Sequence, residues 1–467
     1  MKNQKSTTSQ PPSILIRNAD VVNEGLIHPA DVLIRDGHIN RIDSSIDAQA
    51  DIVIDASGKA LLPGMIDCHV HFREPGLTHK ADMASESAAA VAGGVTSVME
   101  MPNTNPPTVT NERLEEKFAL ASQKMRTNYS FYLGASLHNL DEIKAVDRKN
   151  VCGVKVYMGS STGDMLVDHL QTLENLFREC PINLAAHCED ATLISANEKT
   201  FRERYGDKTP FAAHPLIRNA EACFKSSKLA VELARKYETR LHILHISTAK
   251  ELELFNSSVV RVGTARETEC FIELQGDNIT GEACVHHLFF DDSAYETLGA
   301  RIKCNPAIKT ASDREALLKG LVSDRLDTIG TDHAPHTLEE KQGTYWSAPS
   351  GIPVIQSALP SILEHFHNDI LTLELIAEKT AHAPARIFNV AERGYIREGY
   401  WADLVLIDLN KPTLVTQENI LYKCGWSPFE GVTFRSSVDT TIVSGQIAYR
   451  NNTVDPTAHG QRLLFNR

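Results

Sequence analysis

Residues 67–74, with the sequence DCHVHFRE, directly follow the apolar run ALLPGMI of residues 60–66. Such a run predicts a buried strand, and side chains on a strand repeat every second residue, so His69 and His71 are expected to point the same way. Two imidazoles side by side can share a metal ion. An isolated H-x-H pair is equally well explained by a chance surface pair, so its meaning depends on the rest of the chain.

Length and composition limit the domain organisation, the partners and the cellular compartment that can be expected. The chain has 467 residues, which suggests one large domain and a smaller one, and its net charge of -13 argues against nucleic acid or an anionic membrane as partner. No apolar stretch reaches the roughly 18–20 residues needed to cross a bilayer, and the polar N-terminus shows no secretory signal. Nine cysteines without a framework spacing fit reduced thiols, so a cytoplasmic protein is expected.

From about residue 61, short apolar runs alternate with amphipathic segments such as 113–124 and 220–237. This alternation predicts buried parallel strands joined by helices. About eight repeats favour a TIM-like (β/α)8 barrel over an open doubly wound sheet. No G-x-G-x-x-G follows the first run, so a dinucleotide-binding fold lacks its main support. After the run before His69, the further runs are 96–101, 128–133, 153–157, 182–186, 241–246, a weaker one near 270–274, and 328–330.

Both ends of the chain are rich in strands. The N-terminal part contains the runs 13–18, 31–42 and 51–55, with a hairpin signal at Asp36-Gly37, and the C-terminal part contains 402–408 and 439–449. We expect these segments to pair into one small β-sandwich domain. The predicted organisation is a disordered tail (1–12), a composite β domain (13–60 and 391–455) and a metal-dependent α/β barrel (61–390).

Six polar residues fall at or near the carboxyl ends of the apolar runs, where (β/α)8 enzymes keep their chemistry. Four histidines, one aspartate and one inward lysine make a candidate two-metal set. A water between two divalent ions would be strongly acidified, and the aspartate could carry its proton to a leaving group. The neighbouring His333 could orient this aspartate or be merely packed. The set is His69, His71, Lys155, His187, His245 and Asp332.

Lys155 lies inside the otherwise apolar run 153–157. A lysine that points into a barrel is costly unless it is paired or neutral, and burial makes its amine more nucleophilic by lowering its pKa. Such an amine can react with carbon dioxide to give a carbamate, an anionic ligand able to bridge two metals. A snorkelling lysine or a salt bridge is the alternative for Lys155 alone. The other candidate ligands favour the carbamate.

A second group of residues suits an anionic substrate. Arg73 lies two residues past His71, and the arginine guanidinium matches a carboxylate well. Arg73 could instead form a structural ion pair with Glu74 or another acid, and the asparagines of this group could simply form turns. The candidate substrate-binding residues are Arg73, Asn103, Asn305 and His336.

Taken together, these motifs resemble those of the class I dihydroorotases of the amidohydrolase superfamily. The resemblance covers about residues 13–450, including a C-terminal segment, 397–405, that looks like the second half of the superfamily's composite β domain. The motifs that carry it are HVHFREPG (69–76), MPNT (101–104), GVKVY (153–157), HCE (187–189), HIST (245–248) and TDHAPH (331–336).

The resemblance implies a set of roles. His69, His71 and Asp332 would hold one Zn²⁺, His187 and His245 a second, and Lys155, as N6-carboxylysine, would bridge the two. Arg73, Asn103 and His336 would bind the substrate carboxylate, with Asn305 near the pyrimidine ring. A metal-bridging hydroxide would open the ring amide of dihydroorotate reversibly to N-carbamoyl-aspartate, a step of de novo pyrimidine biosynthesis, with Asp332 as proton shuttle and catalytic residue. A homodimer is also implied.

Two departures and two rival functions remain. The family often reads NPPLR where residues 305–309 read NPAIK, and some members carry Asp where this chain has Lys155.

Allantoinase or another cyclic amidase would share every metal ligand, but allantoinases typically carry Asn in place of Arg73 and a Trp-Glu pair in place of His79-Lys80. A catalytically silent assembly partner would have lost metal ligands, whereas all six are present here.

Overall fold

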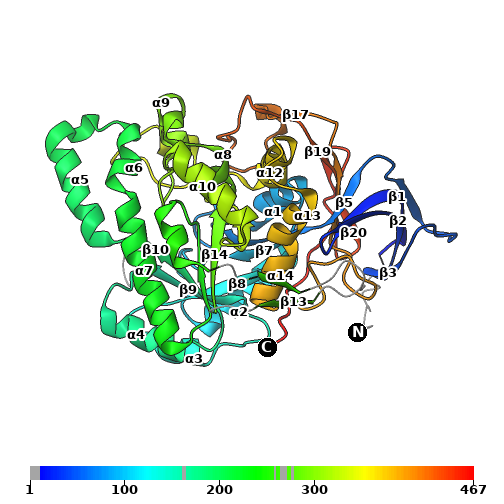
Figure 1. Ribbon diagram of the computed structural model, residues 1–467, viewed down its shortest axis with the longest axis horizontal. Helices are drawn as coiled ribbons and strands as arrows, with labels where there is room; N and C mark the ends of the chain where they lie inside the picture. Colours follow the sequence, from blue (N-terminus) through cyan, green and yellow to red (C-terminus); the bar gives the residue numbers. More distant parts are fainter. Residues whose placement is uncertain (1–10, 160–164, 257–258, 263–270, 275–277) are drawn as a thin grey trace, which may run out of the picture.

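The computed structural model describes residues 11–159, 165–256, 259–262, 271–274 and 278–467. Its centre is a barrel of eight parallel strands, ordered as they follow one another in the chain (Figure 1). The barrel strands are β6 (Met65–Val70), β7 (Val95–Glu100), β8 (Asn128–Gly134), β9 (Gly153–Met158), β10 (Leu184–Cys188), β11 (Leu241–Ile243), β14 (Ile279–Cys284) and β15 (Thr328–Gly330). The predicted (β/α)8 architecture is confirmed.

The last strand returns to the first. The backbone N–H of His71, just past β6, donates to the carbonyl of His333, just past β15, at 2.8 Å. Every residue of β6 to β10 is buried, because side chains face either the barrel interior or the surrounding helices. This explains why these strands read as unbroken apolar runs. The closure also brings residues from the two ends of the repeat series next to each other.

Helices cover the outside of the barrel. Several begin with a side chain that caps the first turn, as Asp82 does for α1, Thr110 for α2 and Thr310 for α10. The main helices of the outer layer are α1 (Met83–Ala92), α2 (Asn111–Lys124), α3 (Leu140–Lys144), α4 (Leu170–Glu179), α7 (Ala220–Tyr237), α10 (Ala311–Val322), α12 (Ala358–His367), α13 (Leu373–Ala377) and α14 (Ala383–Phe388). Shorter or projecting helices are α5 (Ala191–Tyr205), α6 (His214–Ile217), α8 (Val285–Phe289), α9 (Tyr295–Leu298) and α11 (Leu338–Lys341).

One strand prediction was wrong. The weak run near 270–274 is not a barrel strand: β13 (Phe271–Leu274) pairs antiparallel with β12 (Val259–Val262) in a separate two-stranded sheet. The seventh barrel strand is β14, between β11 and β15. Its sequence ITGEAC is short, with a glycine and a glutamate at its centre, so it gives no apolar run. Cys270 lies outside the described residues.

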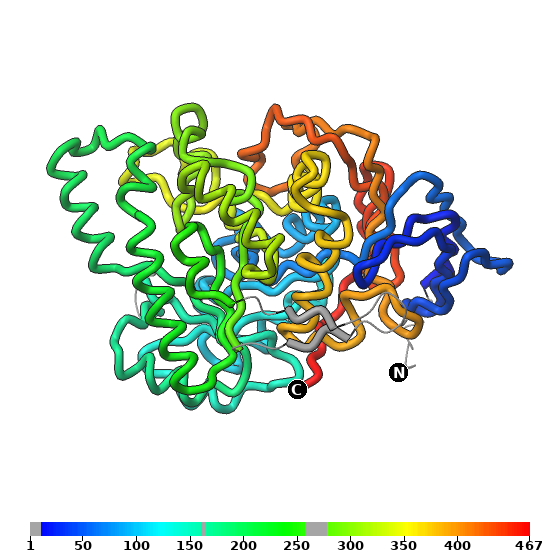
Figure 2. The backbone as a smooth tube through the Cα atoms, viewed as in Figure 1, coloured from blue at the N-terminus to red at the C-terminus, as the bar shows by residue number. Residues whose placement is uncertain are grey.

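The two chain ends do pair into one β domain, as predicted, and its strands form a single sheet. Figure 2 shows the blue N-terminal segment and the orange-red C-terminal segment side by side at one end of the molecule. The strands run in the order β21-β20-β19-β16-β5-β1-β2-β3, with β4 also paired to β1. They are β1 (Ile14–Asn23), β2 (Leu26–Arg35), β3 (His38–Asp43), β4 (Ile52–Asp55), β5 (Ala60–Pro63), β16 (Leu404–Asp408), β19 (Ser437–Val443), β20 (Gln446–Arg450) and β21 (Thr453–Val454).

Local turns follow the sequence signals. Asp36 and Gly37 form the two-residue turn between β2 and β3, with φ angles of 51° and 80°. Positive φ at both positions is the geometry that matches the twist of a two-residue hairpin. A further small hairpin pairs β17 (Thr413–Leu414) with β18 (Thr433–Phe434). Most of the predicted disordered tail, residues 1–10, lies outside the described residues.

Two compositional expectations can be set against the structure. Within the described residues, no helix combines the length and apolar character that a membrane crossing requires. All cysteines among the described residues are free.

Candidate metal centre and active site

The six candidate ligands converge at the carboxyl-terminal end of the barrel. His69 lies in β6, Lys155 in β9 and His187 in β10, whereas His245 and Asp332 lie two residues beyond the ends of β11 and β15. All six side chains belong to buried residues, with exposed fractions of 8% or less. The parallel strands therefore carry separated sequence positions to one face, as expected for this fold.

The first subset consists of His69, His71 and Asp332. The Oδ1 atom of Asp332 lies 3.0 Å from Nε2 of His71 and 3.2 Å from Nε2 of His69. One ligand atom from each of the three residues lies within 4.8 Å of the others. These three side chains form a preassembled group of two nitrogens and one oxygen, which suits a zinc ion.

The second subset adjoins the first. Nδ1 of His187 lies 2.8 Å from Nε2 of His245. The ring of His245 is 5.2 Å from the ring of His69, measured between centroids. All four candidate histidines and Asp332 therefore belong to one continuous site.

The outer nitrogen of three of these histidines is held by an acceptor. Nδ1 of His69 donates to Glu282 at 2.9 Å, and Nδ1 of His71 donates to Oδ1 of Asn103 at 2.7 Å. Nε2 of His187 lies 3.0 Å from Oε2 of Glu189. Such outer acceptors fix the tautomer, so that the inner nitrogen presents a lone pair.

The inner nitrogens of His69 and His71 face a carboxylate oxygen of Asp332, and that of His187 faces a ring nitrogen of His245. An acceptor that faces an acceptor at about 3 Å is unfavourable unless a cation or a proton lies between them. The arrangement of His69, His71, His187 and Asp332 is therefore the one that a bound metal would stabilise. Zinc fits the donor set by this test.

The electrostatics favour a positive charge at the same place. Burial opposes protonation of His69, but the carboxylates of Asp332 and Glu282 raise its pKa to about 9. Burial likewise opposes ionisation of Asp332, but His69 and His71 hold its pKa well below the usual range. The negative charge that stabilises a proton on His69 would equally stabilise a metal cation.

Lys155 has no salt-bridge partner among the described residues. Its Nζ atom forms no hydrogen bond with any described residue and lies 4.6 Å from the centre of the Tyr157 ring. Burial lowers the pKa of Lys155 to about 7, so much of the amine is uncharged near neutral pH. These surroundings suit a neutral amine or its carbamate better than a snorkelling or ion-paired lysine.

Three predicted site residues have strained backbone. The φ angles of Arg73, His245 and Asp332 are 67°, 41° and 46°, in the left-handed region that non-glycine residues rarely adopt. Glu282 also needs a close approach to β15, because a Cβ atom on Gly330 would lie 2.5 Å from its Oε2 atom. Strain of this kind is retained where the surrounding structure fixes a side chain for a function.

Arg73 and His336 lie together beside the metal candidates. Nε of Arg73 donates to the carbonyl of Pro335 at 3.1 Å, and its NH2 group lies 3.3 Å from Nε2 of His336. Arg73 is 7% exposed, yet it forms no ion pair with a carboxylate among the described residues. Glu74 pairs with Lys124 instead, so the structure does not contain the Arg73–Glu74 ion pair that the sequence left open.

The two asparagines differ in their surroundings. Oδ1 of Asn103 is taken by His71, so this residue positions a candidate metal ligand. Oδ1 of Asn305 is shielded from solvent and has no hydrogen-bond partner among the described residues. Asn305 therefore retains an acceptor for a ligand.

His333 is packed and does not orient Asp332. Its Nε2 atom donates to Glu86 at 2.7 Å, and its Nδ1 atom accepts from the backbone N–H of Val354 at 3.0 Å. Both ring nitrogens of His333 therefore have partners other than Asp332. The open question on His333 is answered in favour of packing.

Sequence reasoning missed the residues that support the site. Lys80 donates to Nδ1 of His336 at 3.1 Å and pairs with Glu340 at 3.0 Å. Glu282 and Glu189 hold His69 and His187. The motif HCE contains Glu189, but nothing near His69 in the sequence points to Glu282, which is 213 residues away.

Comparisons with known proteins agree on the family. A model described as "Amidohydrolase family" matches residues 60–448. A dihydroorotase of Methanosphaera stadtmanae is 31% identical over 95% of this chain and 97% of that protein. A dihydroorotase of Halobacterium salinarum is 33% identical over 89% of this chain and 92% of its own length, and an allantoinase of Desulfitobacterium hafniense is 31% identical over 96% and 98%.

Solved structures give the same fold with other substrates in their names. L-hydantoinase (dihydropyrimidinase) from Arthrobacter aurescens superposes with a TM-score of 0.86 at 27% identity, covering 95% of this chain and 97% of its own. A dihydropyrimidinase from Brevibacillus agri superposes with a TM-score of 0.85 at 25% identity, covering 97% and 100%. The fold is thus common to proteins named for several cyclic amides.

Proposed function

The chain belongs to the amidohydrolase family, and we propose that it is a dihydroorotase, which reversibly hydrolyses the ring amide of (S)-dihydroorotate to N-carbamoyl-L-aspartate. This would place it in de novo pyrimidine biosynthesis, in the cytoplasm, as a homodimer. The similarity to proteins that act on cyclic amides supports the reaction class. The choice of dihydroorotate rests on one observation, the buried Arg73.

A buried guanidinium without a carboxylate is costly unless a ligand completes it. Arg73 lies two residues beyond His71, and the charge of Asp332 acts on it. His336 lies beside it and is held by Lys80. A substrate with its own carboxylate would complete this group, because arginine binds carboxylates through paired charge-assisted hydrogen bonds. Allantoin and simple hydantoins carry no carboxylate.

Two zinc ions fit the remaining side chains. His69, His71 and Asp332 would hold one and His187 and His245 the other, with Lys155 as N6-carboxylysine between them. Ions in these positions would supply an acidified water near neutral pH and polarise the ring carbonyl.

The protein's own groups would perform the proton transfers. Oδ1 of Asp332 faces His69 and His71, which leaves its second oxygen to take the proton from the attacking water. The new carbon–oxygen bond forms as the ring carbon–nitrogen bond breaks, and Asp332 returns the proton to the leaving nitrogen. Arg73 and His336 would hold the carboxylate, with Asn103 beside it, and Asn305 would face the ring.

The rival functions make different demands on Arg73. Allantoinase or another cyclic amidase would use the same candidate ligands but would leave Arg73 without an anionic partner. A catalytically silent assembly partner would not need a lysine buried without a partner at Lys155 or strained backbone at Asp332.

The test is hydrolysis of dihydroorotate, allantoin and hydantoin by zinc-loaded protein and by an Arg73→Ala variant. We expect turnover of dihydroorotate alone, reduced about 100-fold or more in kcat/KM by Arg73→Ala, since at least two charge-assisted hydrogen bonds are lost. Arg397→Ala is the matched control, because Arg397 lies on the surface in an ion pair with Glu24. Turnover of a neutral ring would instead assign another cyclic amidase, and no turnover by zinc-containing protein would favour the silent partner.

A further inference from the structure

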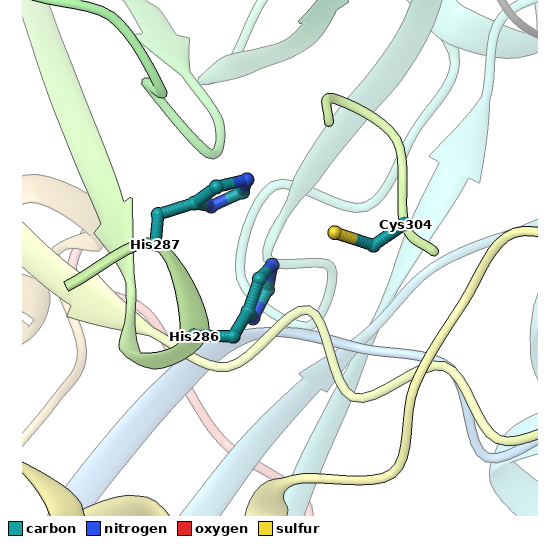
Figure 3. Close-up of side chains that lie close together, drawn as sticks. All are labelled: His286, His287 and Cys304. Atoms are coloured by element: carbon teal, nitrogen blue, oxygen red, sulfur yellow. The ribbon is translucent and has the colours of Figure 1, made fainter. Parts of the chain in front are cut away.

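A second group of metal-ligating side chains lies outside the six candidate ligands. His286 and His287 lie in the first turn of α8, which directly follows β14, and Cys304 lies in the loop before Asn305. Figure 3 shows the two rings and the sulfur turned toward a common space. One ligand atom from each residue lies within 4.8 Å of the others.

The lone pairs of this cluster are unused. Nε2 of His287 donates to the carbonyl of Pro306 at 3.0 Å, which leaves Nδ1 as an unprotonated acceptor. That Nδ1 atom has no hydrogen-bond partner among the described residues. Neither ring nitrogen of His286 has a well-formed one, although the backbone of Thr331 partly offsets the burial that lowers the pKa of His286. The exposed fractions of His286, His287 and Cys304 are 0%, 3% and 1%. Buried polar nitrogens without partners are rare in folded proteins and require an explanation.

We propose that His286, His287 and Cys304 form an additional binding site for a borderline-soft divalent cation such as Zn²⁺. Two imidazoles and one thiolate are a common zinc ligand set, and a water would complete the tetrahedron. The thiol of Cys304 loses one proton on binding, so that the site carries one net positive charge. Ligand atoms around one tetrahedral zinc lie roughly 3.5 Å apart, which is compatible with the 4.8 Å limit that the three ligand atoms satisfy here.

The orientation of His287 supports this assignment. A metal-binding histidine normally donates its other N–H to a carbonyl or a carboxylate, and Pro306 supplies such a carbonyl. A competing group, His69, Glu282 and Cys284, has compatible distances. In that group Glu282 already accepts from His69, at 2.9 Å, and lies 3.5 Å from the sulfur of Cys284. In the cluster of His286, His287 and Cys304 the thiol donates to the carbonyl of Pro306 at 3.3 Å, but the acceptor nitrogens of the two rings remain available to a metal.

Cobalt gives a test that does not depend on turnover. None of the six candidate ligands contains sulfur, so a sulfur-to-cobalt charge-transfer band requires a cysteine ligand. Metal-free full-length protein titrated with Co²⁺ is expected to develop this near-ultraviolet band, and zinc-loaded protein should bind one Zn²⁺ more than its Cys304→Val variant. Cys304→Val should abolish the band, whereas Cys284→Val, the matched buried control, should keep it.

The opposite results would overturn the proposal. No charge-transfer band in wild-type protein saturated with Co²⁺ would exclude a cysteine-ligated site. A band lost in Cys284→Val and kept in Cys304→Val would assign it to the competing group. If Cys304→Val does not fold, Cys304→Ser and His287→Gln replace it. A band that persists unchanged in His287→Gln would also reject the site.

Discussion

At the amino-terminal end of the barrel, buried polar groups satisfy one another, whereas at the carboxyl-terminal end two buried cations lack an anionic partner among the described residues. At the amino-terminal end of β8, Asn128 donates to Asp403 at 2.9 Å, and Asp403 forms an ion pair with Arg393. Ser444 joins the same network through Asn128, at 2.8 Å. At the opposite end, Lys155 has no hydrogen-bond partner and Arg73 no carboxylate among the described residues.

This difference separates stability from function. A polar network that satisfies itself fixes the contact between the barrel and the composite sheet, and gains nothing from a ligand. Polar groups left incomplete reduce stability until a ligand completes them. The comparison therefore predicts that substitutions at the carboxyl end reduce activity more than stability, and substitutions at the amino end the reverse.

The largest expected effect is at Asp332. Asp332→Asn preserves the shape of the side chain but cannot take up a proton, so kcat for dihydroorotate should fall by about 10³–10⁴-fold. Thermal unfolding should remain a single cooperative transition. Zinc content, measured alongside, separates loss of the proton carrier from loss of metal. A variant with normal zinc and more than a tenth of wild-type kcat would remove Asp332 from the proposed role.

The next effect is at the opposite end of the barrel. Asp403→Ala leaves the buried Arg393 without its carboxylate and should lower the free energy of unfolding by about 3–5 kcal/mol. The kcat of the folded fraction should stay within about twofold, because Asp403 lies far from the chemistry. Denaturant unfolding and steady-state kinetics measure the two quantities.

A paired variant provides the control. Replacing both partners, Arg393→Met with Asp403→Leu, should recover much of the lost stability, since no unpaired charge remains buried. Equal loss of activity and stability in Asp403→Ala would contradict the division between the two ends.

The sequence predicted the candidate ligands because, apart from Lys155 inside β9, they lie at or near the ends of barrel strands. A strand end can be recognised locally, and the fold carries all such ends to one face. The supporting residues are different in kind. Glu282 contacts His69 across 213 residues, and it sits in β14, the strand that the sequence misplaced. Because Glu282 is charged, it interrupts the apolar pattern by which a buried strand is recognised. No local motif marks it as the partner of His69.

Lys80 was missed for a related reason. The sequence marked His79-Lys80 as a difference from allantoinases, but not as a contact of His336, which lies 256 residues away. The local sequence could also not decide whether Arg73 pairs with Glu74, because the partner of Glu74 is Lys124, at the end of α2. Pairings of long side chains depend on tertiary packing, which periodicity does not describe.

The free-energy cost of burying the Lys155 amine can be measured through the pH dependence of stability. Its pKa is about 7 in the folded protein, by burial, and ordinarily 10.5. Between these values the unfolded chain binds more protons, so stability should rise with pH from 7 toward 10. Metal-free wild type in buffer free of carbon dioxide should gain about 2 kcal/mol more than Lys155→Met between pH 7 and 9.

Other buried lysines do not confuse this measurement. Burial also lowers the pKa of Lys341 to about 7 and that of Lys303 to about 8. Both contribute equally to wild type and variant, so the difference between the two stability curves reports Lys155 alone. Parallel curves would show that Lys155 keeps its proton in the folded state.

The smallest effect concerns Lys80 and refines the comparison within the carboxyl end itself. Lys80 donates to Nδ1 of His336, which keeps the other nitrogen protonated and bonded to the carbonyl of Ser350 at 3.1 Å. Lys80→Met should raise the KM for dihydroorotate about 10-fold, about 1.4 kcal/mol, and leave kcat within about threefold, because Lys80 holds the carboxylate pocket and not the reacting atoms.

Lys225→Met makes the same charge change at an exposed lysine paired with Asp190, and should alter neither constant. If Lys80→Met lowered kcat and left KM unchanged, Lys80 would act on the chemical step, and the carboxylate pocket would consist of Arg73 and His336 alone. Lys80 would then serve the reaction directly, and recognition of the substrate carboxylate would rest on Arg73 and His336.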